Sequence, residues 1–257
     1  MGYWENTTYL AHADAPAVAA AIVELFSQEG MAHVARPAER DHVPYDPMQY
    51  ATALQNNLWG VAVFSGSEGW TVIKTAPLEL LGERATGKNR MRLLELADRL
   101  GAAGFQINLY DSTALLMVEA DGHGRYLLSG YRGMSDGDPL DFHGEQLRED
   151  RIDVRFEYLP LQSHVEAHTS ETYEGHRRTD DNALAQDLAQ TLGGNNAAWC
   201  DNVTCVDTLL CHKPLPIADG IDLYFRWPAG DRPEDEFRAE CERRRAKIAA
   251  AFRQQGS

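Results

Sequence analysis

The stretch of residues 58–131 constrains the fold more than any other part of the sequence, because segments typical of strands and of a helix follow one another there with glycine at nearly every break. Residues 58–64 and 70–75 are rich in Val, Ile, Trp and Phe, and the intervening SGSEG is typical of a hairpin connection. The apolar spacing of residues 89–100, which Gly101 ends, predicts a helix. An antiparallel hairpin followed by a helix is therefore expected.

Three further strands are predicted after this helix, at residues 105–110, 114–120 and 125–130. The turn before the last of them contains Gly122 and Gly124, which adopt a positive φ at little steric cost. Together these segments predict an α+β fold with mostly antiparallel sheet and helices packed on it. The chain length also allows two halves of similar size.

An acidic segment at residues 134–150 is the expected boundary between those halves. It contains Asp136, Asp138, Asp141 and Glu145, while Arg148 is its only basic residue. We expect residues 1–133 to form a first half that begins with a short strand at 7–11 and a helix capped by Asp14. Residues 151–257 are expected to form the second half, with strands at 154–159, 203–212 and 221–227 and helices at 180–192 and 233–254.

The formal charge is 24 − 39 = −15, which opposes binding to nucleic-acid phosphates and to anionic lipid surfaces. No apolar run reaches the roughly 20 residues of a membrane span. The sequence has four cysteines, three of them crowded between Cys200 and Cys211, which is unlike the framework of a small secreted domain. With no basic leader before an apolar stretch, these features predict a cytoplasmic protein with reduced thiols.

Residues 82–89, GERATGKN, have the spacing of a phosphate-binding P-loop and precede the helix predicted at residues 89–100. The last position is Asn89, whereas the motif needs a Ser or Thr hydroxyl to hold magnesium. The segment before it also reads as a helical turn and not as a buried strand. We interpret the match as fortuitous and predict no cofactor.

The side chains of His164, Glu166 and His168 alternate with apolar residues, and His176 follows close by. In a strand the three polar side chains would share one face, and in a helix the two histidines would stand one turn apart. Either arrangement could hold a metal ion or exchange protons near neutral pH. Because the segment lacks apolar flanks, a solvated loop without metal is the preferred interpretation.

The residues Cys200, Cys205, Cys211 and His212 also suggest a zinc site, but four and five residues separate successive cysteines. Structural zinc sites use closer pairs. If residues 203–212 form a strand, Cys211 and His212 point to opposite faces and cannot act as nucleophile and base. Small buried cysteines in the core of a sheet are therefore expected.

Neither the Gly-x-Ser-x-Gly turn of serine hydrolases nor the glycine fingerprint of dinucleotide-binding proteins occurs in the sequence. The preferred hypothesis is a non-enzymatic binding protein, such as a bacterial immunity protein or antitoxin, that presents its acidic surface to a basic protein. The alternative is a hydrolase-like enzyme that uses His164, Glu166 and His168. The predicted helix at residues 233–254 could dock a second copy of the chain.

Overall fold

The computed structural model describes residues 5–41, 58–76, 80–82, 90–110, 114–124, 126–132, 161–171, 177–200 and 202–226. Its main feature is an eight-stranded sheet with the order β2-β10-β3-β4-β1-β5-β6-β7, in which every neighbouring pair is antiparallel. The strands are β1 (Glu5–Leu10), β2 (Ala32–Val34), β3 (Trp59–Ser65), β4 (Thr71–Ala76), β5 (Gly104–Tyr110), β6 (Ala114–Ala120), β7 (Tyr126–Arg132) and β10 (Ile221–Arg226). The predicted α+β class with antiparallel sheet is confirmed.

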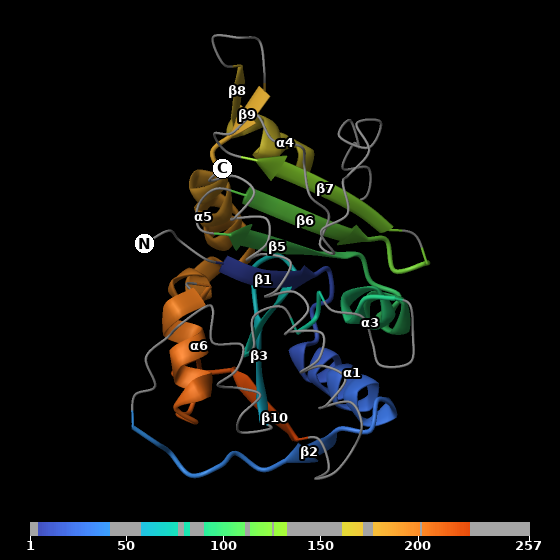
Figure 1. Cartoon of the computed structure of the whole chain (residues 1–257), viewed down its shortest axis with the longest axis vertical. Coiled ribbons are helices and arrows are strands. Elements are labelled where there is room, and N and C mark those ends of the chain that lie inside the picture. Colours follow the sequence, from blue (N-terminus) through green and yellow to red (C-terminus); the bar gives the residue numbers. More distant parts are fainter. Residues whose placement is uncertain are drawn as a thin grey trace, which may run out of the picture.

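Helices cover both faces of this sheet (Figure 1). One face packs against α1 (Ala15–Gln28) and α3 (Arg92–Leu100), and the other against α5 (Asp181–Leu192) and α6 (Asn202–Leu210). The remaining elements are helix α4 (Leu161–Ala167), the 3-10 helix η2 (Gly194–Trp199), and the antiparallel pair β8 (Thr169–Glu171) and β9 (Arg177–Thr179). No helix in the described ranges is both long and apolar enough to cross a membrane.

The ends of the first two helices follow the local signals in the sequence. Asp14 caps α1 by accepting a 3.0 Å hydrogen bond from the amide of Ala17. Helix α3 ends at Gly101, which has the left-handed φ of +58°. In the turn between β6 and β7, Gly122 and Gly124 have φ angles of +74° and +94°. The predicted turn chemistry is therefore confirmed at these positions.

The strand predicted at residues 203–212 is wrong, because most of this segment forms helix α6. Its Val, Thr and Leu residues favour strands locally, but Cys205, Val206 and Leu209 are buried together at helical spacing. The amides of His212 and Lys213 close the helix end by donating to the carbonyls of Leu209 and Thr208. Packing of the apolar stripe on the sheet thus decides against local strand preference.

Several sequence predictions concern parts of the chain outside the described residues. These are the acidic segment at 134–150, the strand at 154–159, the helix at 233–254, and all of the P-loop-like segment except Gly82. The division into two halves stays a prediction. In the described part of the chain, β10 lies between β2 and β3, so strands from both sides of the acidic segment share one sheet.

Candidate functional site

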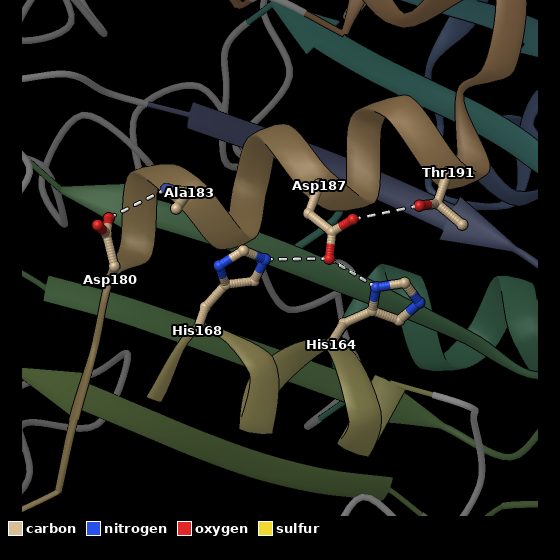
Figure 2. Close-up of polar contacts among 6 residues, drawn as sticks. All are labelled: His164, His168, Asp180, Ala183, Asp187 and Thr191. Carbon is tan, nitrogen blue, oxygen red and sulfur yellow. Dashed lines mark hydrogen bonds and ion pairs between the residues drawn. The ribbon is translucent and has the colours of Figure 1, made fainter. Parts of the chain in front are cut away.

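The candidate site lies where helix α4 meets helix α5. The amide of His168 donates to the carbonyl of His164 across 3.3 Å, which places the two histidines one helical turn apart. The loop predicted for this segment is therefore wrong, since residues 161–167 are helical. Helix α5 begins after Asp180, whose side chain caps the amide of Ala183 at 3.0 Å. Asp187, in the second turn of α5, lies opposite the two histidines (Figure 2).

A single carboxylate oxygen joins the two imidazoles. The distance from His164 Nδ1 to Asp187 Oδ2 is 2.7 Å, and that from His168 Nε2 to the same oxygen is 3.1 Å. Thr191 Oγ1 lies 3.3 Å from the other oxygen, Oδ1, and donates to it. The His164, His168 and Asp187 side chains are 23%, 25% and 31% exposed, so solvent reaches the group. We call these three residues the His–Asp–His cluster.

The ionisation of Asp187 follows from two opposing effects. Partial burial disfavours the charged form, but the hydrogen bonds from His164 and His168 outweigh it, and the pKa of Asp187 is lowered. Because the ionised carboxylate can only accept, each imidazole donates an N–H to it. Neutral His164 then carries its proton on Nδ1 and leaves the Nε2 lone pair free to accept one.

This arrangement is suited to acid–base chemistry. An aspartate that accepts from one imidazole nitrogen orients the ring and fixes its tautomer, so that the other nitrogen can take up a proton. Of the residues proposed from the sequence, His164 and His168 meet in the cluster. Glu166 is exposed on α4 and makes none of these contacts, and His176 lies outside the described residues.

The geometry of the His–Asp–His cluster differs from that of a metal site. A metal needs donors arranged around one common centre, about 2.0–2.2 Å from each. Figure 2 instead shows the two imidazoles approaching one carboxylate oxygen from different sides, each hydrogen-bonded to it. Within the described ranges, no group of three or more His, Cys, Asp or Glu side chains is placed to hold a metal ion.

The cysteines and His212 lie elsewhere: Cys200 precedes α6, Cys205 lies within it, and Cys211 and His212 follow its last residue. Cys200, Cys205 and Cys211 are buried, and none of the three forms a disulfide. His212, which has a φ of +58°, donates from Nδ1 to the carbonyl of Ala38 across 3.0 Å. Burial lowers the pKa of His212 and favours its neutral form. These contacts fasten the segment before Asp41 to the end of α6, which is a structural role.

A small hollow lies next to these residues, lined by Arg40, His212, Tyr224 and apolar side chains of α6 and the sheet. Its volume of about 10 Å³ is room for roughly one water molecule. Arg40 Nε donates across 2.5 Å to the carbonyl of Leu210, the last residue of α6. The hollow therefore suits a bridging water and is too small for an organic substrate.

No protein-family model matches the chain, and no match was found among the curated proteins or the solved structures. The chemistry of the candidate site therefore rests on its own geometry.

Proposed function

We propose that the chain is a non-enzymatic binding protein that presents an acidic surface to a basic protein partner, as immunity proteins and antitoxins do. The observation that carries the proposal is the formal charge of −15. A field of this sign attracts cationic partners and repels nucleic acids and anionic membranes. It also accelerates the encounter with a partner of opposite charge.

The distribution of charge over the two helical layers supports this proposal. Between Asp180 and Cys211, the stretch that includes α5, η2 and α6, the sequence contains five aspartates and neither lysine nor arginine. On the other face, the basic side chains of and around α3 form ion pairs with acidic ones: Arg90 with Asp98, Arg92 with Glu29, and Arg99 with Glu24. The acidic residues of the α5–α6 stretch are thus not offset by basic residues of the same stretch, whereas those beside α3 are paired.

The acidic residues proposed from the sequence as contacts for the partner, Asp136, Asp138, Asp141 and Glu145, lie outside the described residues. Their role is tested by replacing the four with Asn or Gln. A matched control removes four other charges, at the exposed residues Glu24, Glu39, Asp41 and Glu68. Both variants have a net charge of −15 + 4 = −11, so a difference between them reports position and not total charge.

The experiment is cross-linking in a lysate of the source cells, followed by purification of the captured protein and measurement of its affinity for each variant. The proposal predicts a basic partner whose affinity falls at least tenfold more in the segment variant than in the control, since several ion pairs of about 0.5–1 kcal/mol each are removed. A neutral or acidic partner, or equal losses in the two variants, would contradict it.

A second candidate function is supported by the His–Asp–His cluster: a hydrolase-like enzyme in which His164 or His168 transfers protons. The supporting observation is the 2.7 Å contact that lets Asp187 orient His164. The test is the turnover of p-nitrophenyl esters and phosphodiesters by the wild type and by H164A, with E166A as the control from the same helix. Turnover lost in H164A and kept in E166A would favour this candidate. Equal rates in all three proteins would remove its support.

A further inference from the structure

Glu119, on β6, is buried to an unusual degree for a carboxyl group. Glu119 is only 1% exposed, and within the described part of the chain neither Oε1 nor Oε2 has a hydrogen-bond partner. A buried carboxylate without a partner is among the least favourable groups in a protein interior, because it loses its hydration and gains nothing in return. Glu119 therefore calls for an explanation that the proposed binding function does not supply.

The register of the sheet shows which face Glu119 occupies. It lies directly opposite Phe105 on β5, and Phe105 lies opposite Tyr9 on β1. Directly opposed residues share a face of the sheet. Phe105 packs in one apolar cluster with Leu184 and Leu188 of α5, whereas Val118 and Ala120 of β6 join the cluster under α1 and α3. Glu119 thus points to the α5 side.

The surroundings of Glu119 on that side are aromatic and apolar. Tyr9 stacks on Phe105 with a centroid distance of 4.9 Å, and Trp70 meets Phe105 edge-on at 5.8 Å. Helix α5 contributes Leu184, Ala185, Leu188 and Leu192 to the cluster around Phe105. An aromatic and apolar layer on this face of the sheet favours a neutral side chain at position 119.

Among the residues that the structure describes, few titratable groups face this position. On the same face, β1 contributes Tyr9, and Asp121 follows at the end of β6, where its Oδ1 accepts from the amide of His123. Helix α5 contributes Asp187, which is engaged by His164 and His168. Burial is the cause that raises the pKa of Glu119, to about 8. The carboxyl group is therefore protonated in the folded chain at neutral pH.

We propose that the protonation state of Glu119 controls the packing on the α5 side of the sheet. The neutral side chain permits the closed packing of this layer, and the ionised side chain opens the layer. An ionised carboxylate at this position needs water. Water reaches it only when α5 or the neighbouring strands move away from β6. Loss of one proton from Glu119 thus converts a closed apolar layer into one that opens locally and exchanges with solvent.

The sign of the pH dependence follows from linkage. The folded pKa lies above the unfolded value of 4.5, so the folded chain holds the extra proton between pH 4.5 and about 8. Stability is greatest below this window and falls as the pH rises through it. Each unit of pKa difference is a tenfold change in the unfolding equilibrium constant. Between pH 6 and pH 9, ionisation of Glu119 raises the unfolding equilibrium constant by about a hundredfold.

The experiment compares the wild type with E119Q and E119M, which cannot ionise, and with E68Q, which removes an exposed glutamate. Unfolding constants from urea titrations are measured at pH 6, 7, 8 and 9. Amide hydrogen exchange of peptides from α5, β5 and β6 is measured over the same range and corrected for intrinsic rates. From pH 6 to pH 9, the unfolding equilibrium constants of the wild type and E68Q are expected to rise about a hundredfold more than those of the two Glu119 variants.

The exchange of α5 peptides is expected to rise above pH 8 in the wild type and in E68Q, and to stay level in E119Q and E119M. Parallel pH profiles in all four proteins would overturn the proposal. Failure of both Glu119 variants to fold would also overturn it, because the native state would then need the charged side chain. A pH response without faster exchange of α5 would contradict the opening of this layer.

Discussion

Arg92 of helix α3 forms a buried two-point ion pair with Glu29, the residue that follows helix α1. Arg92 Nε lies 3.0 Å from Glu29 Oε1, and Nη2 lies 2.9 Å from Oε2. Both side chains are only 4% exposed. The guanidinium also donates to the carbonyl of Leu80 and lies over the rings of Phe26 and Trp59. This contact joins the two helices of one layer to the segment after β4.

Replacement of Arg92 by Met is expected to destabilise the fold by about 3–5 kcal/mol, because it leaves the carboxylate of Glu29 buried without its cation. The control is R90M. The Arg90 side chain is 30% exposed and its ion pair with Asp98 lies near solvent, so a loss below about 1 kcal/mol is expected. Urea unfolding measures both. Equal losses of unfolding free energy in R92M and R90M would show that burial of the Arg92–Glu29 ion pair does not add to its effect on stability.

Two glycines of one turn provide a second comparison. Gly122 and Gly124 both have positive φ, but a Cβ at Gly122 would lie 2.7 Å from the backbone of Ala102, and a Cβ at Gly124 would meet nothing within 4 Å. G124A is expected to cost about 1 kcal/mol through backbone strain alone. G122A is expected to cost roughly 3 kcal/mol, since backbone atoms must also move. Similar melting temperatures for the two variants would contradict this close approach.

The His–Asp–His cluster predicts a stability difference at acid pH. The pKa of Asp187 is lowered in the folded state, so its contribution is present above the unfolded pKa of 3.8 and is lost as the pH falls through the folded value. D187N is expected to be less stable than the wild type at pH 7, by about 1 kcal/mol or less at this partly exposed site. The difference should vanish near pH 2. Urea titrations at both pH values test this, and an unchanged difference would contradict it.

The buried thiols predict slow modification. Cys200, Cys205 and Cys211 are 1%, 0% and 2% exposed, and a thiol must be reached by solvent before it reacts. Alkylation with iodoacetamide, followed by mass analysis of the peptides that contain these cysteines, should show little labelling in the native chain and complete labelling in urea. Rapid native labelling of Cys205 would contradict its buried position on α6.

The parts of the fold that the sequence predicted well are those in which partners are close along the chain. The hairpin of β3 and β4 and the meander of β5, β6 and β7 join neighbouring segments through short connections, and those after β3 and β6 contain glycine. Strand-forming residues and turn chemistry therefore predict them. These local patterns could not predict the placement of β10 between β2 and β3. That pairing depends on contacts between residues nearly 200 positions apart, such as Tyr224 and Val34.

The candidate site was predicted in part. His164 and His168 were proposed from their spacing, but Asp187, which orients them, was not. The sequence predicts a helix around Asp187 and gives no signal that this helix packs against the histidines. Glu119 was missed for a similar reason, since its burial follows from tertiary packing and not from its neighbours in the sequence. A charged residue within a run as apolar as residues 114–120 is the local signal that could have identified it.

The central claim is that negative charge brings this chain to a basic partner, and the salt dependence of association tests it most directly. The association rate constant of the captured partner is measured by stopped flow between about 0.02 and 0.5 M NaCl, where the Debye length shortens from roughly 20 Å to below 5 Å. The account predicts a fall of at least tenfold over this range for the wild type and a shallower fall for the variant of Asp136, Asp138, Asp141 and Glu145. A rate constant independent of salt would contradict the claim.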